Sequence, residues 1–93
     1  MTKQRFASVW DAIEDTPEEA ENMKLRSSLI IALKKHVAGT GLGQARIAKL
    51  FGVTQPRLSD LMRGKIDVFG LDALVNMATS AGFRIKLSVR KAA

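Results

Sequence analysis

The chain has 93 residues, 46% of them hydrophobic, which fits one globular domain with a small core. Fifteen basic residues against nine acidic ones give a net charge of +6, and the absence of cysteine excludes disulfides and thiolate metal ligands. The longest apolar run, residues 29–33, is much shorter than a membrane span, and residues 1–16 lack the apolar core of a secretion signal. We therefore expect a cytoplasmic protein that binds no membrane.

The first predicted element is a short helix within an acidic N-terminal segment, residues 1–15. The helix begins at Ser8, and its apolar side consists of Val9, Trp10 and Ile13. Trp10 has two open interpretations, as an anchor for a partner or as a residue that packs this helix onto the chain's own core.

Charge is unevenly distributed along the chain. Residues 1–22 hold two bases and six acids, a net charge of −4, whereas residues 23–93 hold thirteen bases and three acids, a net charge of +10. A basic body attracts polyanions and an acidic arm repels them. The asymmetry predicts two different partners, and the alternative is a solvated surface whose charge is merely unevenly spread.

A long helix is predicted over residues 16–37. Thr16 can cap its N-terminus, and Glu19 three residues later completes a capping box. The stripe expected to be buried consists of Leu25, Leu29, Ala32, Leu33 and Val37. Ile30 and Ile31 widen the apolar surface beyond one face, which predicts contacts with more than one neighbouring element.

Two short helices follow a glycine-rich break at residues 39–43. They span residues 44–51 and 54–62 and are joined by a tight turn at Gly52 and Val53. The apolar residues expected between them are Ile47, Ala48, Phe51, Val53 and Leu58. This spacing is typical of a helix-turn-helix, in which the second helix places its first residues in the major groove of DNA. A generic helical hairpin would show the same apolar positions.

The remaining predicted elements are a loop at residues 65–70, a helix at residues 71–82 and a strand at residues 83–90. The core stripe of that helix is expected to be Leu71, Leu74, Val75 and Ala78. Along the strand, apolar residues alternate with polar ones, and the apolar set is Phe83, Ile85, Leu87 and Val89.

A single strand in a helical domain leaves its backbone N–H and C=O groups unpaired. We expect the strand to pair antiparallel with that of a second copy and form a homodimer interface from its four apolar residues. Pairing with residues 2–6 of the same chain is the alternative. The predicted fold is therefore mainly α, a five-helix domain with a C-terminal strand, divided into residues 1–15, a helix-turn-helix domain at 16–82, and a dimerising strand and tail at 83–93.

No residue pattern supports catalysis or a bound cofactor. The run at residues 39–45, GTGLGQA, follows a helix rather than a strand, which excludes a dinucleotide-binding unit. His36 is the only histidine and has no cysteine or acidic cluster beside it, so no metal site is predicted. Ser27, Ser28 and Ser59 lack a base at the spacing of a nucleophilic site.

Residues 42–82 resemble the XRE-type helix-turn-helix of phage Cro and repressor proteins, through the run from Gln44 to Gly52 and TQPRLSDLMRGK. The longer pattern, from FASVWDAIED to GKIDVFGLDALVNMATSAGFRI, resembles HigA-like antitoxins of type II toxin–antitoxin pairs. That resemblance implies a dimeric repressor that binds its own operator and neutralises a RelE/HigB-like ribonuclease toxin. A stand-alone phage-type or host repressor, or an adaptor that binds only proteins, are the alternatives.

The resemblance also implies roles for individual residues. In this family the first residue of each of the two helices is commonly glutamine, so Gln44 is expected to hold a phosphate and Gln55 to reach an adenine. The expected base-contacting residues are Gln55, Pro56, Arg57 and Asp60. The expected phosphate-contacting residues are Gln44, Thr54, Ser59, Arg63 and Lys65. Asp60 has alternative roles, as an acceptor from cytosine or as an ion-pair partner of Arg57 or Arg63. Gly43 departs from the Ser or Thr cap of many relatives.

A toxin-binding surface is expected in the acidic N-terminal segment, because a ribonuclease that grips RNA presents a basic surface. The residues expected to form it are Phe6, Trp10, Asp11 and Glu14.

Overall fold

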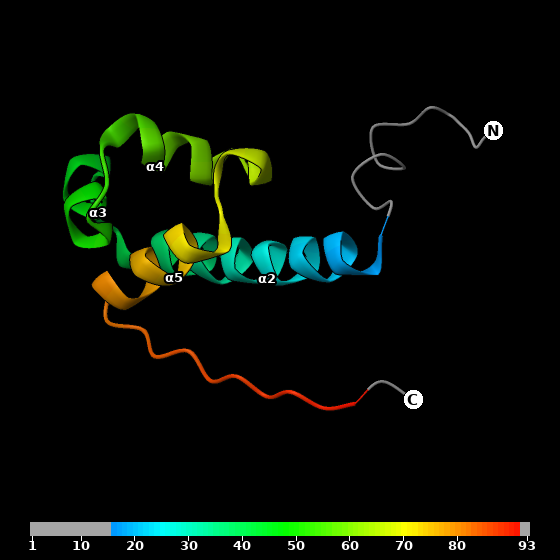
Figure 1. Ribbon diagram of the computed structural model, residues 1–93. Helices are drawn as coiled ribbons and strands as arrows, with labels where there is room; N and C mark the ends of the chain where they lie inside the picture. The colour runs from blue at the N-terminus through cyan, green and yellow to red at the C-terminus, as the bar shows by residue number, and fades with distance from the viewer. Residues whose placement is uncertain (1–15, 92–93) are drawn as a thin grey trace.

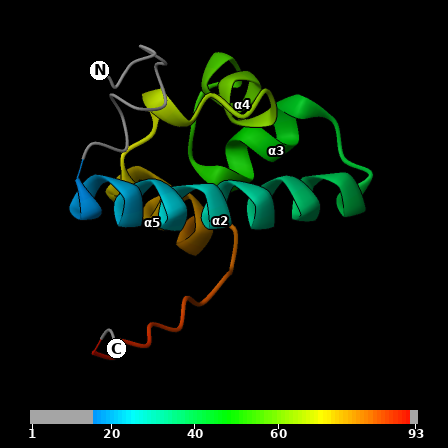
Figure 2. The same ribbon diagram turned by 90° about the vertical axis from the view of Figure 1, so that its right-hand side faces the viewer.

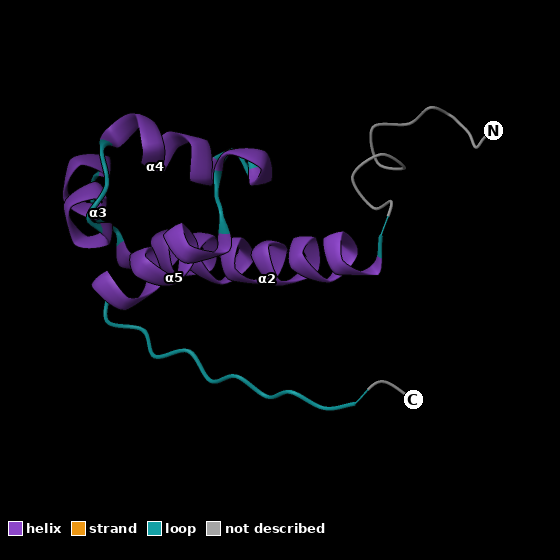
Figure 3. Ribbon diagram, viewed as in Figure 1, coloured by secondary structure: helices purple, strands orange, loops and turns teal. Residues whose placement is uncertain are grey.

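The computed structural model describes residues 16–91 and consists of four α-helices and one 3-10 turn within that range (Figures 1 and 3). The elements are α2 (Pro17–Thr40), α3 (Gln44–Phe51), α4 (Gln55–Met62), η1 (Ile66–Val68) and α5 (Leu71–Ser80). The mainly helical fold is confirmed, and the helices predicted from residue 16 onward are present. The helix expected to begin at Ser8 lies outside the described residues.

Helix α2 forms the long axis of the domain (Figures 1 and 2). Thr16 caps it as predicted, since its Oγ1 accepts a hydrogen bond of 3.1 Å from the backbone N–H of Glu19. The helix continues to Thr40, three residues beyond the predicted end at Val37, because Gly39 is accommodated in its last turn. α3 and α4 lie on one side of α2, and α5 packs along α2 itself (Figure 2).

The core lies where α3, α4 and α5 meet the C-terminal half of α2. Its most deeply buried side chains are Leu33, Phe51, Leu58, Leu61, Phe69 and Leu74, each no more than 1% exposed. The residues expected between α3 and α4 are all buried or half-buried in this core. Phe69 was expected in a loop, but it is fully buried because η1 turns the chain back onto the helices.

Two expected core stripes need correction. In α2, Ile30 and Met23 are buried, whereas Leu25 is 39% exposed and Ala32 is exposed. In α5, Met77 is buried and Val75 is 36% exposed. In each helix several apolar residues compete for the inner face, and the contacts with other elements select which of them is buried.

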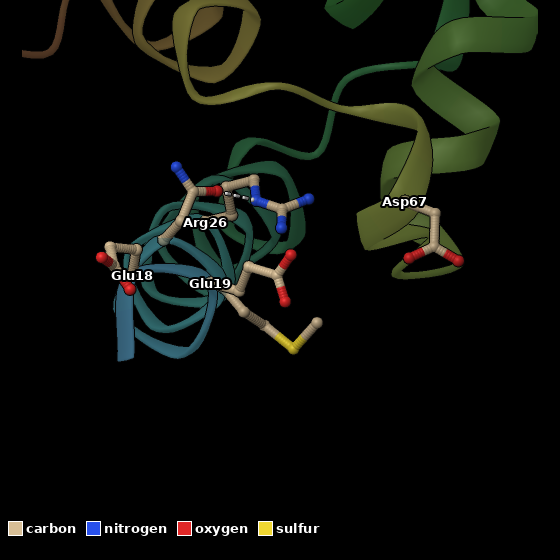
Figure 4. A pocket seen from close by; sticks show the side chains of 6 residues that line it. Glu18, Glu19, Arg26 and Asp67 are labelled. Carbon is tan, nitrogen blue, oxygen red and sulfur yellow. Dashed lines mark hydrogen bonds between the residues drawn. The ribbon is translucent and has the colours of Figure 1, made fainter. Parts of the chain in front are cut away.

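Arg26 ties α2 to the turn that follows α4. Its Nη1 donates to the backbone carbonyls of Ile66 at 3.1 Å and Phe69 at 3.5 Å, and its Nε donates to the side-chain carbonyl of Asn22 at 2.7 Å (Figure 4). The Ile66 carbonyl also accepts the N–H of Phe69 at 3.3 Å within η1, so Arg26 adds a second donor there and supplies a donor to the Phe69 carbonyl. Arg26 thus fixes the path of the chain from α4 to α5.

The predicted strand at residues 83–90 is not formed. Residues 83–91 have no regular secondary structure and run away from the helices as an extended segment (Figure 3). The N–H groups of Gly82 and Phe83 bond to the carbonyls of Thr79 and Ala78, which closes α5 and turns Phe83 onto the core. Beyond Phe83, residues 16–91 contain no neighbouring strand with which a ladder of hydrogen bonds could form.

Candidate nucleic-acid interface

The turn between α3 and α4 is fixed by its own backbone. The N–H of Gly52 bonds to the carbonyl of Lys49 at 3.1 Å, and that of Val53 bonds to the carbonyl of Ala48 at 2.9 Å. This pair of bonds requires a left-handed residue at position 52, and Gly52 adopts it with φ of 71°. Val53 then points into the core, so α4 leaves the turn at one defined angle.

The first turn of α4 projects polar side chains into solvent. Thr54 caps the helix, because its Oγ1 accepts a hydrogen bond of 3.3 Å from the N–H of Arg57. Its hydroxyl proton remains free to donate to a phosphate. Gln55 and Pro56 are exposed, while Leu58 behind them is fully buried. The buried leucine holds the helix so that its first turn faces outward.

The first turn of α3 is also exposed and carries no side-chain cap. Gly43 occupies the cap position, as the sequence indicated, and Gln44 follows it as the first helical residue. The N–H groups of this turn and the Gln44 side chain are therefore available to an anion such as a phosphate.

Arg57 lies against the protein in this structure. Its guanidinium carbon is 4.7 Å from the centre of the Phe69 ring, an arrangement that stabilises both groups by a cation–π interaction. A contact between Arg57 and a base would have to replace this stacking on Phe69.

Asp60 sits between two bases near the end of α4. Its Oδ1 is 3.3 Å from Arg63 Nη2 and 3.6 Å from Lys65 Nζ, and its side chain is 25% exposed. Of the alternatives left open by the sequence, the structure shows the ion pair with Arg63 and adds Lys65. The exposed residues Arg63 and Lys65 are thus held close together, while Ser59, one turn before Arg63, is half-buried.

Two exposed basic residues on α3 escaped the sequence-based prediction. Arg46 and Lys49 line a shallow groove together with Val53 and Gln55, so they face the same side as the start of α4. Arg46 directly precedes and Lys49 directly follows the buried pair Ile47 and Ala48, which already indicated exposure. What the sequence did not indicate is that the turn brings them beside Gln55.

A second shallow hollow lies at the other end of the domain. It is lined by Glu18, Glu19, Asn22, Met23, Arg26 and Asp67. Figure 4 shows Glu18 and Glu19 of α2 beside Arg26, with Asp67 of η1 farther away on the opposite side. This hollow is mainly acidic, in contrast to the basic surroundings of Gln55.

The remaining predicted sites fall into two groups. Of the four expected dimer-interface residues, Phe83 is half-buried on the core, while Ile85, Leu87 and Val89 are 40%, 78% and 85% exposed. The four expected toxin-binding residues, Phe6, Trp10, Asp11 and Glu14, lie outside the described part of the chain. Among residues 16–91 no group of His, Cys, Asp or Glu is arranged to hold a metal ion. None of the helices described is long and apolar enough to cross a membrane.

The family model described as a helix-turn-helix domain matches residues 12–90. No curated protein matches the sequence.

Proposed function

Because the chain belongs to the helix-turn-helix domain family, we propose that it is a sequence-specific DNA-binding repressor that reads the major groove with the first turn of α4. The observation that carries this proposal is the exposed, polar first turn of α4, which the capped turn at Gly52 and the buried Leu58 hold rigidly. Gln55 would read a base, and the first turn of α3 with Gln44 would hold a phosphate.

Basic residues around this surface support the proposal. Arg46 and Lys49 precede α4, and Arg63 and Lys65 follow it, so each end of α4 has cations near it. Cations placed in this way neutralise phosphates on both sides of a groove, which supplies affinity that falls as salt rises. Asp60 keeps the two cations at the exit of α4 together.

A binding-site selection from random duplex DNA tests the proposal. We expect one enriched sequence, bound in fluorescence anisotropy with an affinity at least about a thousandfold above that for unrelated DNA. Equal binding to selected and unrelated duplexes would exclude sequence-specific repression, and the absence of salt-dependent DNA binding would favour an adaptor that binds only proteins.

We further propose that the protein acts as a homodimer on a two-fold operator. The exposed Ile85, Leu87 and Val89 support this, because an apolar, unpaired extended segment is a template for pairing with another chain. A dimer would place two α4 helices on half-sites about 34 Å apart, one turn of DNA. Removal of residues 83–93 should give monomers in analytical ultracentrifugation, and an unchanged dimer mass would refute this role of the segment.

The finer proposal is an antitoxin that represses its own operon and neutralises a basic ribonuclease. It is supported by the net charge of −4 on residues 1–22, by the resemblance to HigA-like antitoxins, and by the position of Glu18, Glu19 and Asp67 at the end of α2 remote from α3 (Figures 1 and 4). Co-expression with a small basic ribonuclease encoded beside this gene should relieve growth arrest. Without such a partner the protein is a stand-alone repressor.

A further inference from the structure

One flank of α2 carries apolar residues that the domain covers only in part. Leu25, Leu29 and Ala32 recur at spacings of four and three, and His36 continues the same line along the helix. Leu25 is 39% exposed, Ala32 is exposed and Leu29 is half-buried. We call Leu25, Leu29 and Ala32 the α2 stripe.

The C-terminal segment, residues 83–91, begins beside this flank. The Phe83 ring packs edge-on against His36, with ring centroids 4.8 Å apart and planes at 79°. From there the segment passes on the side of α2 away from α4 and heads toward the N-terminal end of α2 (Figures 1 and 2). The apolar residues of the segment and the α2 stripe therefore both extend from the contact between Phe83 and His36 toward the N-terminal end of α2.

We propose that dimerisation closes this segment onto α2. Two copies pair their segments as an antiparallel ribbon, and each segment lays Ile85, Leu87 and Val89 on the α2 stripe of its own chain. This inference rests on the homodimer proposed above and names the surface that the ribbon covers.

The extended segment and the part of α2 from His36 back to Glu18 have similar lengths. From His36 to Glu18, α2 rises about 27 Å at 1.5 Å per residue. An extended chain from Phe83 to Lys91 spans about 26 Å at 3.3 Å per residue. A segment that starts at His36 therefore reaches the first turn of α2 with its last described residue.

The charges on the segment and on α2 favour the same direction of the segment, from His36 toward the N-terminal end of α2. Arg90 and Lys91 would reach the acidic beginning of α2, near Glu18 and Glu21. The partner's segment runs antiparallel in the ribbon, and on this stripe it would bring the same two cations to the basic C-terminal half of α2, beside Lys35. Like charges in contact oppose binding, so each segment is assigned to its own α2.

Backbone hydrogen bonding explains why the segment is undocked in the single chain. A lone extended segment pressed onto a helix would bury N–H and C=O groups without partners, which costs more free energy than a few apolar contacts return. Pairing with a second segment satisfies those groups, so docking and dimerisation occur together.

A charged substitution in the stripe tests the surface. Leu25→Glu should raise the dimer dissociation constant by more than about tenfold, because the ribbon would bury a carboxylate. Ile31→Glu is the matched control, since Ile31 is 62% exposed on the same helix but about 100° around it from Ala32. Equal dimer affinity of the Leu25→Glu variant and the unaltered protein in sedimentation equilibrium would overturn the proposal.

Cysteine cross-linking tests the direction. The chain has no cysteine, so Leu25→Cys with Val89→Cys introduces a single pair. Mild oxidation should give a cross-link within one chain, seen as a faster monomer band on a non-reducing gel. Covalent dimers would overturn the assignment of each segment to its own α2. Ile31→Cys with Val89→Cys is the control and should not cross-link at the same oxidant concentration.

The two proposals fail differently. If removal of residues 83–93 leaves the dimer intact, the segment does not form the dimer and both proposals fall. If that truncation gives monomers while Leu25→Glu still dimerises fully, the dimer proposal stands and the docking on the α2 stripe is wrong. Circular dichroism of each variant checks that the helices are retained.

Discussion

At the scale of single residues, Gln55 and Lys65 stand at opposite ends of α4 and should contribute differently to DNA binding. Gln55→Ala should weaken the selected site by about 1–3 kcal/mol and relax the preference at one base pair, because a bidentate contact is lost. Lys65→Ala should weaken binding to all duplexes alike and should reduce the slope of log K against log salt concentration by about one unit. Anisotropy titrations at several salt concentrations measure both effects. An equal loss of affinity for all sequences in Gln55→Ala would show that the Gln55 side chain contacts the DNA backbone and not a base.

Arg26 should stabilise the domain although it lies outside the helix-turn-helix. Arg26→Ala leaves the carbonyls of Ile66 and Phe69 without this donor, and we expect the free energy of unfolding to fall by about 1–3 kcal/mol in urea. Lys24→Ala is the control on the same helix, because its side chain is 77% exposed and its 3.9 Å pair with Glu21 contributes little. Equal stability of the two variants would show that the η1 carbonyls are satisfied without Arg26.

Several individual roles could not be predicted from the sequence because they depend on contacts between distant residues. Arg26 bonds to carbonyls about forty positions away, and the stacking of Arg57 on Phe69 depends on where η1 returns the chain. Gln55 and Pro56 were predictable as exposed residues, because Thr54 and the buried Leu58 define their positions locally.

At the scale of elements, the angle between α3 and α4 should depend on Gly52. An alanine at this position would have to adopt the left-handed backbone conformation of Gly52, which is strained for a residue with a side chain. Its Cβ would also lie 3.3 Å from Ser80 Oγ, which donates a 2.8 Å hydrogen bond to the Leu50 carbonyl. Gly52→Ala should therefore lower the free energy of unfolding by at least about 1–2 kcal/mol. Gly39→Ala in α2 meets no atom within 4 Å and should be neutral or stabilising by up to about 1 kcal/mol. Thermal unfolding of both variants measures the difference, and equal melting temperatures would contradict it.

The described helices were predictable because most of their boundaries are set locally. Thr16 and Thr54 cap as expected, and glycines 52 and 82 close α3 and α5. The prediction of a C-terminal strand was wrong for the single chain, because a strand exists only where a second strand supplies its hydrogen bonds. Alternating apolar and polar residues indicate that a segment can pair as a strand when a partner strand is present. Phe83 is not available for such pairing, because its N–H bonds to the Ala78 carbonyl at the end of α5.

At the scale of the whole molecule, α2 separates two surfaces of opposite charge. Its N-terminal end carries Glu18, Glu19 and Glu21, while the first turns of α3 and α4 lie near its other end (Figure 1). At an ionic strength of 0.15 M, charges are screened over about 8 Å, so groups a helix length apart interact little through solvent. The acidic end should therefore not weaken DNA binding, and a partner bound there leaves the first turn of α4 accessible.

Deletion of residues 1–15 tests whether the two surfaces act independently. We expect the shortened protein to retain its helices and to bind the selected DNA with unchanged affinity, because α3 and α4 are held by buried residues between Ile30 and Ala78. We also expect it to lose the ability to relieve growth arrest by a ribonuclease partner, since Phe6, Trp10, Asp11 and Glu14 are the proposed contacts. Lower helix content in circular dichroism would show instead that Trp10 packs on the core. Full relief of growth arrest by the shortened protein would place the partner site elsewhere, and the acidic hollow between α2 and η1 would be the next surface to substitute, beginning with Glu18→Lys and Asp67→Lys.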